Sequence, residues 1–569
     1  MWLGSCQRAA RPAVPRAARP EGGPPAGHGK GPRAALQQTP ANSSGASGRR
    51  SRAEAPLHHF ARPIAGLSLG LGALARRRSR RFNLSVTRRW AVVDSSTVPS
   101  AIKEALASEM PASLKKGSSK GTMRPLIVAM GTRGDVEPCL YIAEELRARG
   151  HEPLVVSLDG YEAEIAGRRG LEFRSCGLSG VPLSEDYLTG QTRADQVYAD
   201  RGWYGDAWVG VGRSIYSAAT EHGCDLILTT SMGNTHSLDV AEALDLLCIG
   251  LKFCPDIDGQ VPTSAFAPSG YPTGMPGPLN VAAHVLENLR TVGAVFMGGF
   301  IPRVIEFRKE LGLPSQMLGD TEVPVYSPYR QTLQANQPCI YAFSEALAAR
   351  PPEYKPWHFM TGAMGRVAEG EGAPESMSPN LLDFLGKGLD QDDWETRPVC
   401  IAFGSITLAR SSPFQARAVA AARGLGRRVL VVDPDADEEG AAAGDAGLYY
   451  VRSAPYAALF PRCGLVVHHG GAGTLQDCLW AGAPQLIAPV LRWSDQPFWA
   501  SALEGRGLGV ALGEGGTAPD IEAWERALEE GLGRSKEFRD AARRVAAQAS
   551  GERGAKAACD VLEGALRLQ

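Results

Sequence analysis

The stretch from Leu465 to Gly482 constrains the fold of this chain more than any other. Three apolar residues, Leu465–Val467, predict a short buried strand, and two histidines followed by glycines predict a tight turn. The residues Thr474–Trp480 then predict a helix that ends at Gly482. A strand, a glycine-rich turn and a helix N-terminus present unpaired backbone N–H groups to a ligand. The stretch therefore predicts a phosphate site in an α/β domain.

A polar segment, Ser494–Trp499, follows this turn closely and could hold sugar hydroxyl groups. Together, the run His-His-Gly-Gly-Ala-Gly-Thr, the later proline and the run Asp-Gln-Pro-Phe-Trp resemble the donor-binding signature of GT-B nucleotide-sugar glycosyltransferases. The likeness is to the branch of sterol glucosyltransferases and antibiotic glycosyltransferases. The alternative is that this stretch is an ordinary strand–turn–helix connection of an α/β protein. The resemblance implies a donor site made by His469, Gly471, Ala472, Gly473, Thr474, Asp495 and Gln496.

The first folded unit opens with an apolar strand at Pro125–Met130, a turn at Gly131–Asp135 and a helix at Val136–Arg149. A second strand follows, and this βαβ order implies a parallel sheet with its active groups at the carboxyl ends of the strands. The turn is similar to the Gly-Ser/Thr-Arg-Gly-Asp-Val-x-Pro opening of the same branch, in which the aspartate is taken as the catalytic base. Asp135 is the matching residue. The alternative is a carboxylate that caps the helix. Arg133 either orients Asp135 and lowers its pKa or forms a loop salt bridge.

A second strand end, Phe403–Ser405, resembles the Phe-Gly-Ser motif of the family, which implies that Ser405 reaches the donor diphosphate. The fold expected from the resemblance is α/β, with two Rossmann-like domains that face across a cleft. A C-terminal helix braces the first domain. We expect an acceptor domain at residues 123–365, a linker at 366–396, and a nucleotide-sugar domain with terminal helices at 397–569.

Two segments of the first domain interrupt its strand–helix alternation and could line an acceptor pocket. One, Gln196–Tyr216, carries aromatic residues among glycines, and the other, Pro255–Pro278, is rich in proline. Aromatic and proline-rich walls suit a flat apolar acceptor such as a sterol. The alternative is that these side chains anchor loops. The candidate acceptor residues are Trp203, Tyr204, Thr263 and Phe266.

Two long segments predict single helices. Asn280–Leu311 predicts an amphipathic helix whose apolar side faces the core, with a membrane-surface role as the alternative. The Ala/Arg/Glu-rich segment Glu537–Leu568 predicts the terminal helix.

The chain departs from the family pattern at one place that bears on the donor base. Tyr456 and Ala458 stand where the family usually has His and Trp, which weakens the expectation of uridine. Two Asp-x-Asp patterns begin at Asp256 and Asp433. Neither has the strand setting of a metal-dependent transferase, so we expect no metal site.

The predicted activity is an inverting, metal-independent transfer of a hexose, with glucose from UDP-glucose as the expected donor and no cofactor. The expected acceptor is a hydroxyl group of a sterol or another lipid, with peripheral membrane contact as a further possibility. A glycolipid or polyketide-like acceptor is the first alternative. A catalytically silent GT-B binding protein is the second.

The N-terminal residues 1–122 differ in composition from the rest, because Arg, Ala, Pro, Gly and Ser dominate and acidic residues are scarce. Such a segment is expected to be disordered. It also has the composition of a plastid or mitochondrial transit peptide, which we favour over an untargeted extension. The basic cluster Arg76–Arg81 could instead contact anionic lipid.

Bulk composition excludes several other classes of protein. The net charge of −1 gives no electrostatic reason to expect nucleic acid as a partner. Eleven cysteines without Cys-x-x-Cys pairs indicate reduced thiols of an intracellular protein. No apolar run in the sequence reaches the roughly 18–20 residues of a membrane-spanning helix.

Overall fold

The first sheet has seven strands, all parallel, in the order β3-β2-β1-β4-β5-β8-β9. Its inner strands are buried along their whole length, as expected for a parallel sheet that helices cover on both faces. The strands are β1 (Pro125–Ala129), β2 (Leu154–Ser157), β3 (Glu172–Ser175), β4 (Leu226–Thr230), β5 (Leu247–Lys252), β8 (Cys339–Tyr341) and β9 (His358–Met360).

The coordinates are a computed structural model. It describes residues 121–180, 190, 192, 194–195, 203–256, 261–297, 299–327, 330, 337–364, 377–386, 396–404, 413–436, 439–442 and 444–566. All of these residues belong to one compact unit, Val92–Gln569. The predictions for the N-terminal segment 1–120 lie outside the described residues.

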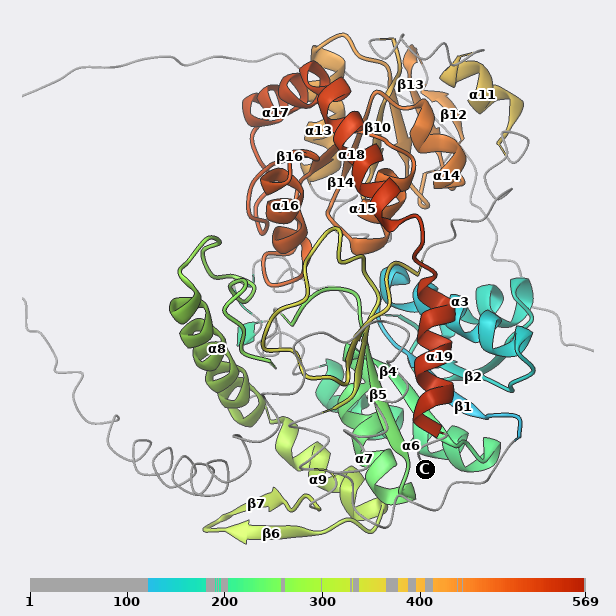
Figure 1. Cartoon of the computed structure of the whole chain (residues 1–569), viewed down its shortest axis with the longest axis vertical. Coiled ribbons are helices and arrows are strands. Elements are labelled where there is room, and N and C mark those ends of the chain that lie inside the picture. The colour runs from blue at the N-terminus through green and yellow to red at the C-terminus, as the bar shows by residue number, and fades with distance from the viewer. Residues whose placement is uncertain are drawn as a thin grey trace, which may run out of the picture. The chain divides into compact units, whose positions relative to one another are not determined.

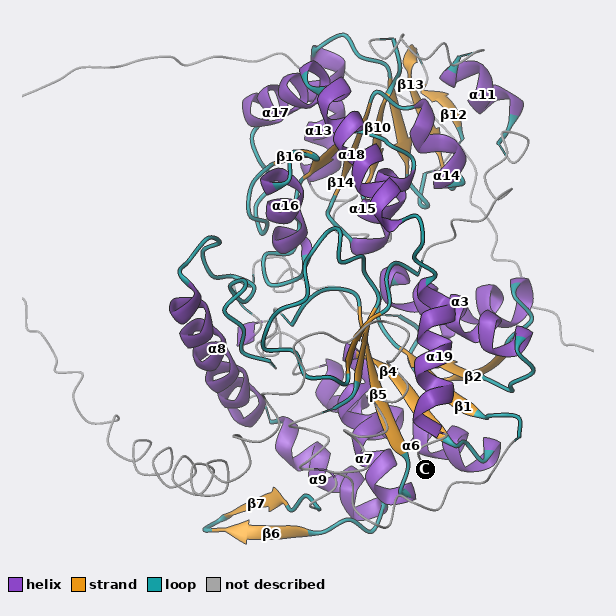
Figure 2. Cartoon of the chain, viewed as in Figure 1, coloured by secondary structure: helices purple, strands orange, loops and turns teal. Residues whose placement is uncertain are grey.

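Helices cover both faces of the first sheet (Figure 2). One apolar core lies between the sheet and α3, and a second lies between the sheet and the layer of α6, α7 and α9. The helices are α3 (Arg133–Ala148), α6 (Trp203–His222), α7 (Asn234–Leu244), α8 (Gly277–Met297) and α9 (Phe300–Glu310). Short helical turns η3 (Asp159–Tyr161), η4 (Ala163–Arg168) and η5 (Ser231–Gly233) and the hairpin β6 (Ser315–Leu318)–β7 (Thr321–Pro324) complete this part.

Two local predictions for this domain are wrong. The helix after the first strand begins at Arg133, within the predicted turn, because Thr132 and Asp135 form a capping box there. The second half of the aromatic segment Gln196–Tyr216 is not an irregular loop but part of helix α6. Its apolar residues Trp208, Val211 and Ile215 are buried at helical spacing against the sheet.

The second sheet also has seven strands, in the order β12-β13-β11-β10-β14-β15-β16. All neighbours are parallel except β12 and β13, an antiparallel pair at the edge that was not predicted. The strands are β10 (Val399–Ala402), β11 (Val429–Val432), β12 (Gly440–Ala442), β13 (Asp445–Val451), β14 (Leu465–His468), β15 (Gln485–Ile487) and β16 (Gly509–Ala511).

The helices of the second domain are α11 (Pro379–Leu385), α13 (Pro413–Gly424), α14 (Tyr456–Leu459), α15 (Ala472–Trp480), α16 (Gln496–Gly505), α17 (Ile521–Gly533) and α18 (Ser535–Ala549), with the turn η7 (Phe460–Arg462). The core beneath α13 and α17 is built around Trp524 and Phe538, both fully buried.

The terminal segment is two helices rather than the single one predicted. Helix α18 ends at Ala549, and α19 (Gly554–Leu566) then lies alongside α3 of the first domain (Figure 1). Between these two helices, the Glu552 carboxylate accepts hydrogen bonds from Ser344 Oγ (2.7 Å) and from the Ala363 N–H (3.3 Å). Buried residues of α19, including Leu562, complete the core beneath α3. The predicted brace of the first domain is confirmed.

The segment Asn280–Leu311 is also two helices, and its predicted orientation is wrong for the first of them. The break falls at Gly299, whose φ of +78° ends α8 and begins α9. In α8 the polar residues Asn280, His284 and Glu287 face the protein, whereas Leu286 and other apolar residues face outward. The expectation of a core-facing apolar side therefore holds for α9 but not for α8.

Candidate active site

The first turn of α3 holds Asp135 at the carboxyl end of β1. Its Oδ2 accepts hydrogen bonds from the backbone N–H (2.7 Å) and the hydroxyl group (3.0 Å) of Thr132. Gly131 has a φ of +135°, and a Cβ atom there would lie 2.3 Å from Asp135 Oδ2. Only glycine therefore fits before this carboxylate. Asp135 therefore caps α3, and its carboxylate also lies at the edge of the sheet where active groups gather.

Arg133 points toward a different carboxylate. Its Nε lies 3.5 Å from Glu137 Oε2, one helical turn further along α3, and its side chain is 60% exposed. The described contact is therefore an ion pair within α3 rather than a bridge to Asp135. The positive charge of Arg133 also acts on Asp477 of α15, where it opposes the rise in the pKa of that carboxyl group.

The two histidines after β14 have different surroundings. His468 Nδ1 accepts the Gly470 N–H (3.2 Å), so its Nε2–H donates to Gln485 Oε1 (3.0 Å). His468 therefore has a structural role within the turn. His469 is also buried, and its Nδ1 has no hydrogen-bond partner among the described residues. A Cβ atom at Gly471 would lie 2.6 Å from its Nε2, and one at Gly404 would lie 3.1 Å from its Cε1. The two glycines leave room for the ring.

Both imidazoles are neutral at physiological pH. Burial lowers the pKa of His468 to about 4, and burial, with a smaller effect of His468, lowers the pKa of His469 to about 3. A neutral His469 can donate one N–H to a phosphate oxygen but brings no positive charge to it.

Helix α15 begins at Ala472, two residues before the predicted start. Its N-cap is Gly471, and no described side chain caps its first N–H groups. The first N–H groups of a helix have no partner within it, so they remain available to an anion. Gly473 is exposed, with no described atom within 4 Å of a Cβ position. The backbone of Gly471, Ala472, Gly473 and Thr474 thus forms the kind of cradle that the resemblance implies.

Gly470 joins this cradle to the start of α16. Its φ is +95°, and a Cβ atom there would lie 2.8 Å from Ile487 Cγ2 and 3.2 Å from the Gln496 carbonyl oxygen. The Gln496 side-chain carbonyl accepts the N–H groups of Val490 (2.7 Å) and Leu491 (2.9 Å). That oxygen therefore fixes the neighbouring loop.

Asp495 precedes α16, and its Oδ2 accepts the Trp499 indole N–H (3.1 Å). Burial, followed by the negative charge of Asp135, raises the pKa of Asp495 to about 7. An effect of one carboxylate on the other requires that they lie near each other, although Asp135 belongs to the first domain and Asp495 to the second. The negative charge of the predicted base thus acts on the predicted sugar-binding carboxylate.

The remaining predicted residues are less completely placed. Ser405 lies outside the described residues. Trp203 and Tyr204 lie in the first turn of α6, but the structure does not describe their side chains. Thr263 is fully buried and donates its hydroxyl group to Glu353 Oε2 (2.8 Å), which ties down the proline-rich loop. Phe266 makes an edge-on contact with Phe498 of α16, with ring centroids 5.2 Å apart.

Tyr456, one of the two departures from the family pattern, has a defined packing partner. Its ring stacks on Phe460, with centroids 4.3 Å apart, and Ala458 is buried beside them. Both departures from the family pattern therefore pack within the second domain.

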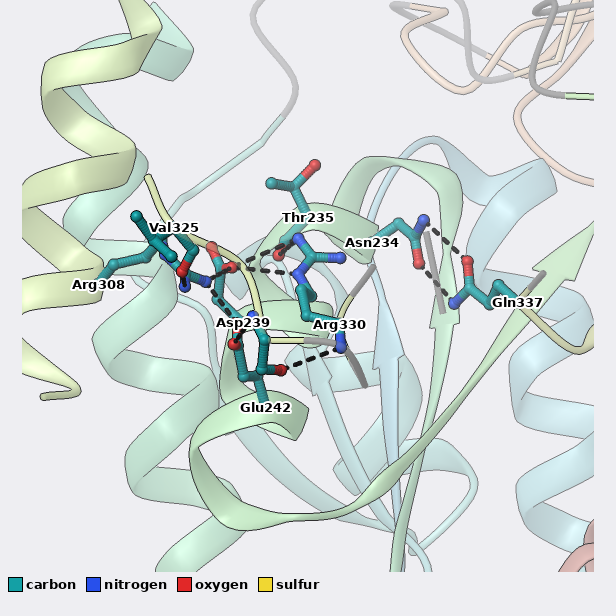
Figure 3. Close-up of polar contacts among 9 residues, drawn as sticks. Asn234, Thr235, Asp239, Glu242, Arg308, Val325, Arg330 and Gln337 are labelled. Carbon is teal, nitrogen blue, oxygen red and sulfur yellow. Dashed lines mark hydrogen bonds and ion pairs between the residues drawn. The ribbon is translucent and has the colours of Figure 1, made fainter. Parts of the chain in front are cut away.

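Two features of the site were missed from the sequence. A small polar hollow lies at the carboxyl ends of β4 and β5, lined by Thr229, Ser231, Asn234, Gly250, Leu251, Lys252 and Gln337. The Asn234 and Gln337 amides exchange hydrogen bonds of 3.1 and 2.9 Å there (Figure 3). The second is Asp477 of α15, whose pKa is raised to about 7, mainly by burial. The hollow could have been predicted from the sequence, because polar residues directly follow a parallel strand there.

Beside this hollow lies a buried cluster of two arginines and two acids (Figure 3). Arg308 Nη1 donates to Asp239 Oδ1 (2.7 Å) and Glu242 Oε2 (2.6 Å), and Arg330 Nη2 lies 3.3 Å from the same Asp239 oxygen. The Arg308 guanidinium lies 4.5 Å from the centre of the Tyr326 ring. The charges balance, so the cluster is a structural tie between α7 and α9.

The two Asp-x-Asp patterns have local roles. Asp256 pairs with Lys252 and accepts the Tyr341 hydroxyl, and Asp433 Oδ1 accepts the Asp435 N–H (3.0 Å). Among the described residues no group of three or more His, Cys, Asp or Glu side chains could hold a metal ion.

Two family descriptions match the chain. Residues 126–193 match the glycosyltransferase family 28 N-terminal domain, and residues 420–557 match the erythromycin biosynthesis protein CIII-like C-terminal domain. These matches fall on the two sheets separately, one on each.

Curated relatives cover most of the chain. O-mycaminosyltylonolide 6-deoxyallosyltransferase of Streptomyces fradiae is 31% identical over 417 residues, which are 68% of this chain and 85% of that protein. Sterol 3-beta-glucosyltransferase of Cryptococcus neoformans is 26% identical over 464 residues, which are 74% of this chain but 27% of that protein.

Solved glycosyltransferases share the fold. Glycosyltransferase VinC in complex with DTDP superposes with a TM-score of 0.53 at 17% identity, and covers 78% of this chain and all of that one. The glycosyltransferase of kitacinnamycin superposes with a TM-score of 0.52, also at 17% identity, over 78% of this chain and 99% of that one. The predicted fold of two Rossmann-like domains is confirmed.

Proposed function

Because the chain belongs to the GT-B family of nucleotide-sugar glycosyltransferases, we propose that it transfers a hexose to a hydroxyl group of a sterol or another lipid. We expect UDP-glucose as the donor, inversion at the anomeric carbon, and neither a metal ion nor another cofactor. The similarity to a sterol 3-beta-glucosyltransferase supports a lipid acceptor. The observation that carries the proposal is the start of α15 beside the buried His469 ring, where a Cβ atom at Gly471 would lie 2.6 Å from His469 Nε2, because this glycine turn can accept a diphosphate.

On the acceptor side, Asp135 is the proposed base. As the acceptor hydroxyl oxygen attacks the anomeric carbon, its proton passes to the Asp135 carboxylate and the bond to the diphosphate breaks. The two hydrogen bonds from Thr132 orient the carboxylate. Arg133 pairs with Glu137, so we propose for it only an electrostatic effect on the site.

On the donor side, the leaving diphosphate would meet hydrogen-bond donors that are already in place. We propose one N–H from neutral His469, the backbone N–H groups at the start of α15, and Ser405. Donors fixed before the reaction typically contribute about 3 kcal/mol each to a developing oxyanion. The amide –NH₂ group of Gln496 and the carboxyl group of Asp495 would hold the sugar hydroxyls.

One observation favours a second acceptor class. The relative with 31% identity is named for the transfer of deoxyallose to O-mycaminosyltylonolide, which favours a polyketide-like acceptor and a deoxysugar donor. The sequence departures at Tyr456 and Ala458 likewise weaken the expectation of uridine. A catalytically silent binding protein is the remaining alternative.

Donor hydrolysis and transfer assays separate these cases. We would supply UDP- and TDP-sugars together with a sterol, a diacylglycerol or a macrolactone, and compare wild type with Asp135→Ala and His469→Ala. We expect at least about a 100-fold loss of turnover for each variant, since each removes a group that acts on the reacting atoms. Arg147→Ala, on the far turn of α3, is the control that should keep activity. Unchanged turnover in both site variants would refute the assignment.

The proposal extends to location. A lipid acceptor would bring the enzyme to a membrane surface, and the composition of residues 1–122 supports targeting to a plastid or mitochondrion. A fluorescent fusion of residues 1–122 tests the second point, because diffuse cytosolic fluorescence would count against it.

A further inference from the structure

Helix α8 turns a stripe of apolar side chains toward solvent. Eight large apolar side chains are clearly exposed among the described residues, and five of them lie on this one helix. Their spacing of three, four and seven residues puts them along one side of it. They are Leu279 (55% exposed), Val285 (46%), Leu286 (50%), Leu289 (64%) and Val292 (53%).

The opposite side of α8 is polar, buried and hydrogen-bonded. Asn280 Nδ2 donates to the Ser264 carbonyl (3.0 Å), and the His284 Nε2–H donates to the Phe266 carbonyl (3.1 Å). The Glu287 carboxylate accepts the Ala194 N–H (2.9 Å) and the Tyr271 hydroxyl (3.2 Å). Turning the apolar stripe inward would break these bonds and leave buried polar groups unpaired. The outward orientation is therefore fixed by the fold.

The loop that α8 holds is the one proposed to line the acceptor pocket. Phe266 of this loop contacts Phe498, and Ser269 Oγ donates to the Ser494 carbonyl (2.8 Å), so the loop also touches the sugar-binding segment. One face of α8 thus supports the acceptor loop while the other lies bare. The two are separated by about 10 Å, the diameter of a helix.

We propose that α8 is an interfacial helix that docks this face of the enzyme on a lipid bilayer, so that a membrane-held acceptor meets the loop behind it. The acceptor part of this inference rests on the proposed function. The docking part does not. Since no described helix is long and apolar enough to cross a membrane, α8 would lie in the interface rather than span it.

Charge and area both favour a bilayer over a second copy of the chain. The 21 residues of α8 carry two charged groups, and the acidic one, Glu287, is buried. The exposed one is Arg290, so no exposed carboxylate on this helix would face lipid headgroups. The five side chains expose on the order of 500 Å², below the roughly 800 Å² per partner of a stable protein interface. A single inserted helix face is enough for interfacial binding.

Vesicle binding by the full-length protein tests this inference without any donor or acceptor. We would sediment it with neutral phosphatidylcholine vesicles, on which the basic cluster Arg76–Arg81 gains little electrostatic attraction. The test variant is Leu286→Glu/Leu289→Glu. The matched control is Met317→Glu/Leu318→Glu on the β6–β7 hairpin, where the side chains are 63% and 61% exposed. We expect at least a tenfold weaker partition for the test variant and wild-type partition for the control.

Several outcomes would overturn the docking role. They are a wild-type protein that stays in the supernatant, binding that survives the double substitution on α8, or equal losses in both variants. A wild-type dimer in light scattering that Leu286→Glu/Leu289→Glu dissociates would assign the stripe to a second copy instead. Loss of transferase activity in the Asp135→Ala variant with intact vesicle binding would separate the two proposals. Unchanged thermal midpoints would show that both variants fold.

Discussion

The substitution Gly470→Ala tests how the donor cradle is joined to the segment that holds the sugar. The added methyl group would lie 2.8 Å from Ile487 Cγ2, 3.2 Å from the Gln496 carbonyl oxygen and 3.4 Å from Gln496 Cα. Two of these three atoms are backbone, so they cannot move aside as the end of a flexible side chain can. The start of α16 must shift away from the turn.

The cost can be worked out from two separate effects. A residue with a Cβ at a φ of +95° costs about 1–2 kcal/mol relative to glycine. Overpacking against Ile487 and Gln496 adds about 1–3 kcal/mol. The reduced entropy of the unfolded chain returns about 0.4–1 kcal/mol. The net loss is roughly 1–5 kcal/mol, which lowers the midpoint of a domain of this size by about 2–20 °C.

Differential scanning calorimetry measures this loss, and Gly473→Ala is the control within the same motif. Gly473 is exposed in the first turn of α15, with nothing described within 4 Å of its Cβ position. Alanine there favours the helix by up to about 1 kcal/mol. We therefore expect Gly473→Ala to keep or raise the midpoint. If the proposed diphosphate site is right, this control should nevertheless bind nucleoside diphosphate more weakly, as measured by titration calorimetry.

A Gly470→Ala protein that melts at or above the wild-type temperature would refute this reasoning about the turn. Equal destabilisation by both substitutions would also refute it, since the two positions differ in φ and in surrounding atoms rather than in motif.

Three further predictions concern stability. Burial raises the pKa of Asp477 in the folded protein to about 7, above its value in the unfolded chain, so the folded protein loses stability as the pH rises from about 4 to 7. The substitution Asp477→Asn should therefore raise the thermal midpoint more at pH 8 than at pH 4.5. An equal gain at both pH values would contradict this. Leu562→Ala in the last helix should lower the free energy of unfolding of the first domain by about 2–5 kcal/mol, because this fully buried side chain completes that core. Chemical denaturation followed by fluorescence measures the loss. An effect confined to the second domain would contradict this reasoning. Arg308→Met should cost about 3–5 kcal/mol because it leaves buried Asp239 undercompensated, whereas Arg303→Met on the exposed side of α9 should cost less than about 1 kcal/mol in the same measurement.

Local patterns predicted the parts of the fold that depend on neighbouring residues. The apolar runs before Gly131 and His468 form β1 and β14, and the alternation of strands and helices does produce two parallel sheets. The turn after β14 carries its own signal, since Gly470 lies against Ile487 and Gln496, and Gly471 lies against the His469 ring.

The predictions failed where a distant segment decides. The apolar side of α8 faces outward because Ser264 and Phe266, more than ten residues earlier, supply hydrogen bonds to its polar side. The terminal helix breaks between Ala549 and Gly554, where the Glu552 carboxylate accepts the Ser344 hydroxyl of the first domain. Neither partner can be found from helical periodicity.

The crossing of the last helix back to α3 has a consequence for the order of synthesis. The core under the first sheet is filled in part by Ala558, Cys559 and Leu562, which leave the ribosome after the second sheet has been made. The nascent first domain must therefore wait with an open apolar groove until the final turns of the chain emerge. During that interval the groove exposes apolar surface, and a stop codon placed after α18 would leave it uncovered.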